Sequence, residues 1–206
     1  MKKYKFGAFY VLPCWIPLVV KEVGEFCKQN GVEIGTGIAF PYGTATTKSK
    51  LNETEEMIEL GCTALDMVAN IGALKDKKYD FYSNEARKFV ELCRSANVVS
   101  KIIIGVGYLT DEEIRAATKI VAEAGADYVK TATGTGPSGR PNLKDVKIML
   151  DVLREMNSPT KLKVAGVVEP RVTGAYSFIR AGAARIGTRG AVEIVESLPM
   201  VQEMLF

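Results

Sequence analysis

Short apolar runs alternate along the chain with longer segments in which apolar residues recur at helical spacing. The runs predict strands at residues 7–12, 32–39, 64–69, 99–104, 127–131, 162–167 and 184–187. Most of these runs are continuously apolar, which is typical of parallel strands that helices cover on their outer face.

The predicted helices lie between the strands, and residues 110–124 form the clearest one. Thr110 can cap its first turn, and Glu113 completes a capping box three residues later. Asp111 and Glu112 add negative charge at the positive end of the helix dipole. Further helices are predicted at residues 142–155 and 174–181.

Glycines mark where the helices end. Gly31, Gly61, Gly125 and Gly182 each stand just before a predicted strand, where a helix often ends in a left-handed residue. Their spacing indicates a repeating βα unit of roughly 30 residues. We therefore predict an α/β fold, a TIM (β/α)8 barrel formed as one domain over residues 1–206. A closed barrel has eight strands, so we expect the first strand to be missing or shortened.

Composition narrows the chemistry. The chain has 206 residues, a net charge of +3 and no histidine. The small net charge gives no reason to expect nucleic acid or a membrane as partner. Without histidine, serine–histidine and cysteine–histidine nucleophile pairs are excluded, and the usual metal ligand is absent. We expect no metal and no other cofactor, with acid–base work left to Asp, Glu, Lys or Tyr.

The cysteines and the N-terminus bear on location. The four cysteines are scattered without a C-x-x-C pair, which favours free thiols in a reducing cytosol: Cys14, Cys27, Cys62 and Cys93. A basic start followed by apolar residues 6–20 resembles a signal peptide, but Pro13 and Pro17 interrupt it and no cleavage site follows. We expect a cytoplasmic protein.

Three charged residues within or at the ends of apolar strands are the candidate catalytic groups. Lys130 ends one strand before a glycine-rich turn, and Lys163 is flanked by apolar residues in the next. If both point into the barrel, each disfavours the other's charge, which activates an amine for imine formation. Asp66 lies in a third strand and needs partners, for which the lysines are the natural choice. The alternatives are lysines that reach solvent and a structural ion pair.

A phosphate site is predicted in the loops that follow the last strands. Glycine lets the backbone approach an anion closely, and barrels often bind phosphate there. Arg189 can add a bidentate contact. The candidate residues are Thr133, Gly134, Thr135, Gly166, Gly187, Thr188 and Arg189, with Gly136 and Gly190 beside them.

Other polar residues are weaker candidates. Tyr10 faces either the core or the site, and Asn70 can share the face of Asp66. Lys48 and Lys50 are expected to meet solvent more often than a ligand. The loop lysines Lys75, Lys77 and Lys78 are expected on the surface.

The sequence resembles the deoxyribose-phosphate aldolase family over nearly its full length. The matching stretches are residues 9–17 (FYVLPCWIP), 39–47 (AFPYGTATT), 66–75 (DMVANIGALK), 107–114 (GYLTDEEI), 124–134 (AGADYVKTATG) and 181–188 (AGAARIGT). The resemblance implies that Lys130 forms the imine, that Lys163 perturbs it and that Asp66 relays protons. It also implies reversible cleavage of 2-deoxyribose 5-phosphate in deoxyribonucleotide catabolism.

The chain departs from the family pattern at several points. Its first predicted strand matches the family's second strand. Gly105 and Val106 replace a Glu-Thr pair, Val167 replaces the second of two glycines, and Arg189 and Gly190 replace two serines. The last two changes touch the phosphate loops and put the substrate in question more than the imine chemistry.

Three hypotheses follow. The first is a class I aldolase of the deoxyribose-phosphate type. The second is an imine-forming aldolase on a different phosphorylated sugar, accommodated by Arg189 and by the loop of Glu169, Pro170 and Arg171. The third is a non-catalytic barrel that has lost activity. The sequence does not indicate the oligomeric state, and a homo-oligomer is possible.

Overall fold

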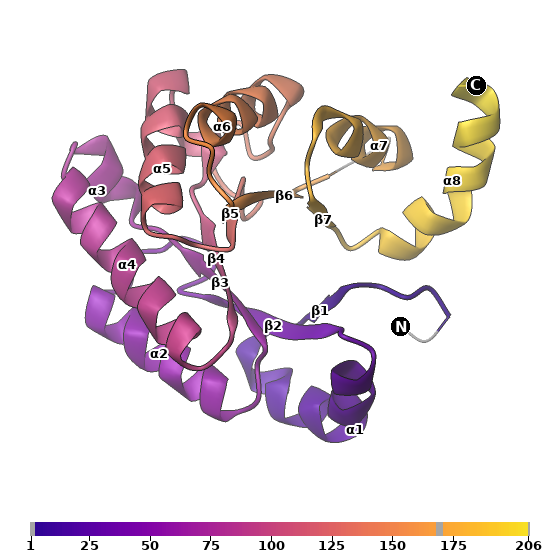
Figure 1. Ribbon diagram of the computed structural model, residues 1–206, viewed down its shortest axis with the longest axis horizontal. Helices are drawn as coiled ribbons and strands as arrows, with labels where there is room; N and C mark the ends of the chain where they lie inside the picture. The colour runs from indigo at the N-terminus through magenta and orange to yellow at the C-terminus, as the bar shows by residue number, and fades with distance from the viewer. Residues whose placement is uncertain (1–2, 168–170, 206) are drawn as a thin grey trace.

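In the part of the chain that the structure describes, seven parallel strands form one sheet whose spatial order follows the chain. The computed structural model describes residues 3–167 and 171–205. The strands are β1 (Ala8–Tyr10), β2 (Glu33–Ile38), β3 (Ala64–Val68), β4 (Val99–Ile103), β5 (Tyr128–Lys130), β6 (Lys161–Ala165) and β7 (Arg185–Gly187). The sheet curls, and β1 and β7 lie at its two edges with no pairing between them in the described ranges (Figure 1). The predicted α/β barrel with fewer than eight strands is thus confirmed as an open half-barrel.

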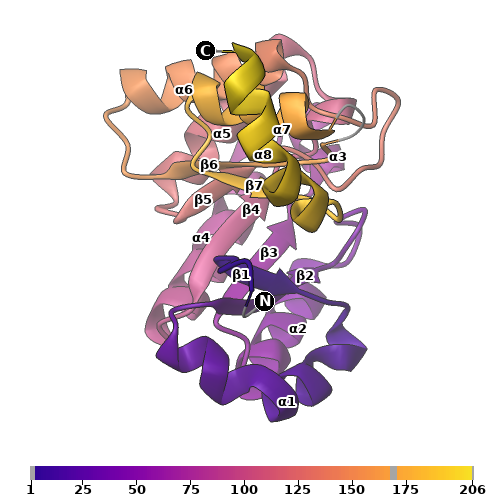
Figure 2. The ribbon, with the colours of Figure 1, turned by 90° about the vertical axis from the view of Figure 1, so that its right-hand side faces the viewer.

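Helices connect successive strands and cover the convex face of the sheet, and the last one follows β7 and packs against the helix before it. They are α1 (Ile16–Gln29), α2 (Thr47–Glu59), α3 (Ile71–Lys75), α4 (Tyr79–Ser95), α5 (Asp111–Glu123), α6 (Leu143–Glu155), α7 (Arg171–Ala181) and α8 (Ala191–Leu205). Two short 3-10 turns, η1 (Pro13–Trp15) and η2 (Val106–Tyr108), follow β1 and β4. Figure 2 shows α8 at the opposite end of the molecule from α1.

The helix boundaries follow the local rules expected from sequence. The capping box of Thr110 and Glu113 is present at the start of α5. A second capping box, formed by Asn142 and Asp145, opens α6. The helix predicted at residues 174–181 begins three residues earlier, at Arg171.

The four glycines that precede strands have left-handed backbone angles, as predicted. Their φ values are 62°, 96°, 76° and 118° for Gly31, Gly61, Gly125 and Gly182. A residue with a Cβ is strained in that conformation, so glycine allows each helix to end and turn into the next strand.

The sheet has an apolar outer face, which the helices cover, and an inner face that carries charged side chains. Leu65, Met67, Ile102 and Val164 are all buried on the side of the helices. Burying each such side chain stabilises the fold by about 1.5–3 kcal/mol. Because successive side chains alternate between faces, the residues between them point into the half-barrel.

Lys50 is a correction to the sequence prediction. It was expected to meet solvent, but its side chain is fully buried. Its Nζ atom donates to Glu85 Oε1 at 2.6 Å and to the carbonyl of Val68 at 2.9 Å. The cause is that α2 begins at Thr47, so Lys50 lies in its first turn and faces β3.

In the described part of the chain, no helix combines the length and the apolar character that a bilayer crossing requires.

Candidate active site

The register of the sheet brings the predicted catalytic residues together. Lys130 of β5 pairs in register with Lys163 of β6, and Asp66 of β3 pairs with Lys101 of β4. The side chains of residues that are paired in register point to the same face of a sheet. All four side chains therefore enter the half-barrel, and all four are buried.

One carboxylate oxygen holds both predicted lysines. Asp66 Oδ2 lies 2.7 Å from Lys130 Nζ and 2.6 Å from Lys163 Nζ. The alternative in which the lysines reach solvent is thus wrong. Burial would raise the pKa of Asp66, but the ammonium groups of the surrounding lysines outweigh it and hold the pKa well below its ordinary value. Asp66 is therefore a carboxylate at neutral pH.

Lys163 is the amine whose ionisation is strongly perturbed. Burial lowers its pKa to about 7, and the charges of Lys130 and Lys101 lower it too, against the attraction of Asp66. Its Nζ atom also lies 3.9 Å from the centre of the Tyr10 ring. Near neutral pH a large fraction of Lys163 is therefore a free amine, able to accept a proton.

A second group of charges lies beside Asp66, and sequence reasoning missed most of it. Lys101 is fully buried, and its Nζ atom donates to the Tyr10 hydroxyl and to Glu33 Oε2, each at 2.8 Å. Arg185 also pairs with Glu33. The sequence allows Tyr10 to face either the core or the site, and its hydrogen bond with Lys101 places it in the site. Lys101 carried the same signal as Lys163, a lysine inside an apolar run.

The predicted phosphate residues lie at the carboxyl ends of β5, β6 and β7 or in the loops that follow them. Thr133 Oγ1 lies 2.7 Å from Thr135 Oγ1 in the first of these loops. Gly134 and Gly166 have positive φ values of 96° and 93°. Gly187 ends β7, Thr188 Oγ1 accepts a hydrogen bond from the amide of Gly190, and Arg189 is exposed. The three loops share one end of the sheet.

Three remaining candidates have other surroundings. Asn70 caps α3 by accepting a hydrogen bond from the amide of Ala73, so its side chain is occupied outside the lysine cluster. Glu169 and Pro170, proposed for a different substrate, lie outside the described residues. Arg171 of the same loop donates to Glu193 Oε2 at 2.6 Å. Lys48, Lys75, Lys77 and Lys78 are exposed, as predicted.

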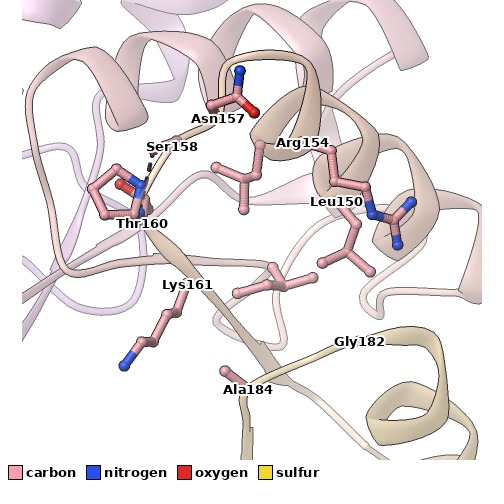
Figure 3. Close-up of a pocket in the computed structure, with 11 residues that line it drawn as sticks. Leu150, Arg154, Asn157, Ser158, Thr160, Lys161, Gly182 and Ala184 are labelled. Carbon is pink, nitrogen blue, oxygen red and sulfur yellow. Dashed lines mark hydrogen bonds between the residues drawn. The ribbon is translucent and has the colours of Figure 1, made fainter.

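A hollow of about 410 Å³ lies at the other end of the strands (Figure 3). It is bordered by the end of α6, by Lys161 at the start of β6 and by Gly182 before β7. None of the predicted catalytic or phosphate residues lines it. It is therefore separate from the lysine cluster.

A curled parallel βα sheet with two lysines on one buried carboxylate has the features of a βα-barrel aldolase. The sequence model described as DeoC/LacD family aldolase matches residues 6–192. The chain belongs to this DeoC/LacD family of aldolases.

Relatives and solved structures agree with this assignment. The deoxyribose-phosphate aldolase of Dictyoglomus turgidum is 40% identical over 194 residues, which cover 94% of this chain and 84% of that protein. That of Thermococcus kodakarensis is 39% identical, over 93% and 84% of the two chains. The solved structure of the aldolase QR15 superposes with a TM-score of 0.85 at 31% identity, over 99% and 86% of the chains. The tetrameric deoxyribose phosphate aldolase of Aeropyrum pernix gives a TM-score of 0.80 at 25% identity, over 97% and 80%.

Proposed function

We propose that this chain is a class I aldolase that reversibly cleaves 2-deoxy-D-ribose 5-phosphate to D-glyceraldehyde 3-phosphate and acetaldehyde. The observation that carries the proposal is the pair of amines on Asp66 Oδ2, with Lys130 and Lys163 at 2.7 and 2.6 Å. The names of the relatives supply the substrate.

Lys130 is the proposed nucleophile. Its side chain is 10% exposed against 5% for Lys163, and it stands at the last position of β5, where the glycine-rich loop begins. Lys163 is covered on one side by the ring of Tyr10. A substrate that arrives at the carboxyl ends of the strands therefore meets Lys130 first.

The proposed reaction begins when the Lys130 amine attacks C1 of the open-chain sugar and water leaves, giving a protonated imine. A base removes the proton of the C3 hydroxyl, the bond between C2 and C3 breaks, and its electron pair moves into the imine to form an enamine. Glyceraldehyde 3-phosphate departs. Protonation of C2 and hydrolysis then release acetaldehyde and restore the amine.

Lys163 and Asp66 are proposed to move the protons. An amine with a pKa of about 7 can both accept and return a proton near neutral pH, which is the property that general acid–base catalysis requires. Asp66 holds both amines on one oxygen and so links them for proton exchange. It also stabilises the cationic imine, because the carboxylate stays ionised.

The loops after β5, β6 and β7 are proposed to bind the phosphate of the substrate. Support comes from the positive φ values of Gly134 and Gly166, which open the backbone to an anion, and from the exposed guanidinium of Arg189. Because Arg189 replaces a serine of the family pattern, a different phosphorylated sugar is kept as the second candidate substrate.

A retro-aldol assay tests the proposal. The purified chain is mixed with 2-deoxyribose 5-phosphate, and release of acetaldehyde is followed with a coupled alcohol dehydrogenase. Unphosphorylated 2-deoxyribose, which would also release acetaldehyde, runs in parallel, and for other phosphorylated sugars the loss of the sugar itself is followed by chromatography. Turnover of 2-deoxyribose 5-phosphate above the others supports the proposal, and turnover of another sugar alone supports the second candidate. No turnover of any sugar, together with no imine, supports a barrel that has lost activity.

We further propose that the protein is cytoplasmic and that it assembles as a homo-oligomer. All four cysteines are unpaired, three of them buried, which is consistent with the cytoplasm. A homo-oligomer is proposed because the Aeropyrum pernix relative is tetrameric. Light scattering of the purified chain measures its mass in solution, and a mass of one chain would contradict the second proposal.

A further inference from the structure

One oxygen of the central carboxylate receives no hydrogen bond from a lysine although an ammonium group lies nearby. Asp66 Oδ1 is buried, and no described lysine donates to it within hydrogen-bond distance. Lys101 Nζ lies 4.0 Å from it. A charge-assisted hydrogen bond between an ammonium and a carboxylate is normally about 2.7–2.9 Å long, so Lys101 is held back from an acceptor within reach.

Two other acceptors hold Lys101. Its Nζ atom donates to the Tyr10 hydroxyl and to Glu33 Oε2, both at 2.8 Å. Glu33 is itself held by an ion pair with Arg185 on β7. Tyr10 lies on the edge strand β1, which pairs with β2, the strand of Glu33. The hydroxyl therefore completes a set of acceptors that competes with Asp66 for the third lysine.

We propose that Tyr10 is a positioning residue whose hydroxyl, together with Glu33, holds Lys101 away from Asp66 and so reserves that carboxylate for Lys130 and Lys163. The inference rests on the proposed function, because its consequence is the ionisation of the amine that moves protons in the reaction.

The backbone makes room for this arrangement at Gly35. A Cβ atom there would lie 2.7 Å from Cε1 and 2.8 Å from Cζ of the Tyr10 ring, closer than carbon atoms pack. Burial, the charges of Asp66 and Glu33 and a hydrogen bond to Asp66 raise the pKa of Tyr10 well above its ordinary value. The phenol therefore stays neutral, and its oxygen remains an acceptor for Lys101 throughout the working pH range.

Loss of the Tyr10 hydroxyl should lower the pKa of Lys163. Lys101 would close on Asp66 Oδ1, so a third ammonium would share the carboxylate and stand nearer Lys163. A cation that approaches, and an anion that is shared, both disfavour the charged form of a lysine. The pKa of Lys163 therefore falls below about 7. The charged and titratable groups around Lys163 are Asp66, Lys101, Lys130, Tyr10, Glu33 and Arg185.

A double-mutant cycle tests the inference. The variants are Tyr10→Phe, Lys101→Met and the double variant, compared with the original chain. Tyr10→Phe keeps the ring and removes one oxygen, so the space beside Gly35 stays filled. The primary readout is the pKa of Lys163, measured by NMR titration of the lysine side chains. The second readout is the pH dependence of kcat in the retro-aldol assay.

We expect Tyr10→Phe to lower the pKa of Lys163 by about half a unit or more, since that is the scale of effect of a moved neighbouring charge. In the Lys101→Met background the same change should not lower the pKa of Lys163, because the lysine that the hydroxyl holds is gone. An unchanged or raised pKa in Tyr10→Phe overturns the inference, as does an equal shift in both backgrounds.

Two provisions keep the test decisive. If Lys101→Met does not fold, Glu33→Gln replaces it. Weakening the other acceptor should lower the pKa of Lys163 as Tyr10→Phe does, and no shift or a rise overturns the inference.

The NMR readout needs no turnover. A chain that shows the predicted shifts but forms no imine refutes the proposed function alone, whereas imine formation without the shifts refutes only this inference.

Discussion

Lys130 and Lys163 are direct neighbours in the register of β5 and β6, and their amines meet on the same oxygen of Asp66. Two ammonium groups on one buried oxygen repel each other, so the arrangement favours loss of one proton. The lowered pKa of Lys163 is the expected result. The chemistry proposed for this chain follows from that single relationship.

Activity should depend on pH through Lys163. Burial lowers its pKa to about 7, so the free amine is the minor form below that pH and the major form above it. If the free amine accepts the proton, kcat should rise with pH through about 7 and then level off. Stopped or coupled assays from acid to mildly alkaline pH measure this. A profile without a rising limb near neutrality would contradict the role given to Lys163.

The substitution Asp66→Asn should destabilise the protein. It leaves buried cations without their anion, and breaking a buried ion pair by removing one partner costs about 3–5 kcal/mol. The free energy of unfolding, measured with urea at pH 7, should fall by that amount. Asp76→Asn is the control, because Asp76 pairs with Lys78 in an exposed loop, and its cost should stay within about 0.5 kcal/mol.

The free energies of unfolding of the original chain and of Asp66→Asn should become more alike in acid. The pKa of Asp66 is held below its ordinary value, so its carboxylate stabilises the fold above the pKa of an unfolded aspartate, about 3.9. This contribution is lost as the pH falls through the lower, folded value. The difference between the original chain and Asp66→Asn should therefore shrink below about pH 4. A constant difference would show that Asp66 stabilises by packing instead of charge.

Gly35→Ala should disturb both stability and the lysine cluster. The added methyl group would collide with the Tyr10 ring and with the carbonyl oxygen of Ala64, and the backbone atom cannot swing aside. Overpacking of this kind costs about 1–3 kcal/mol. Gly7→Ala is the matched control, since a Cβ there meets nothing within 4 Å. Equal unfolding midpoints for the two variants would refute the tight packing of Tyr10.

Arg189→Ala should weaken binding of phosphorylated substrate only. A hydrogen bond to a charged group contributes about 1.5–3 kcal/mol, so KM for 2-deoxyribose 5-phosphate should rise about 10-fold or more. Unphosphorylated 2-deoxyribose should be unaffected. Arg180→Ala, at an exposed position of α7, is the control and should leave both KM values unchanged. A KM for the phosphate ester that does not move would exclude Arg189 from the phosphate site.

Much of the fold was predictable because its signals are local. Continuous apolar runs located the strands, and the capping residues of α5 and the glycines before the strands act within a few residues of the chain. The open edge between β1 and β7 followed from counting strands.

The site was predictable where a charge interrupts an apolar run, as at Asp66, Lys130 and Lys163. Lys101 gives the same signal and was overlooked. Glu33 carries no such signal, because it stands at the first position of its strand, where solvent is the ordinary surrounding. Its importance comes from Arg185 and Lys101, which the chain brings to it from distant strands. Lys50 was misjudged for a related reason, since its partner Glu85 lies on another helix.

The most direct test of the central claim is to trap the imine and locate it. The chain is incubated with acetaldehyde, reduced with borohydride, digested and analysed by mass spectrometry, with Lys130→Arg and Lys161→Arg treated in the same way. Lys161 is the control because it is exposed at the other end of the same strands. The account predicts a two-carbon adduct on Lys130 in the original chain and in Lys161→Arg, and no adduct in Lys130→Arg. An adduct on another lysine, or full retro-aldol activity in Lys130→Arg, would contradict it.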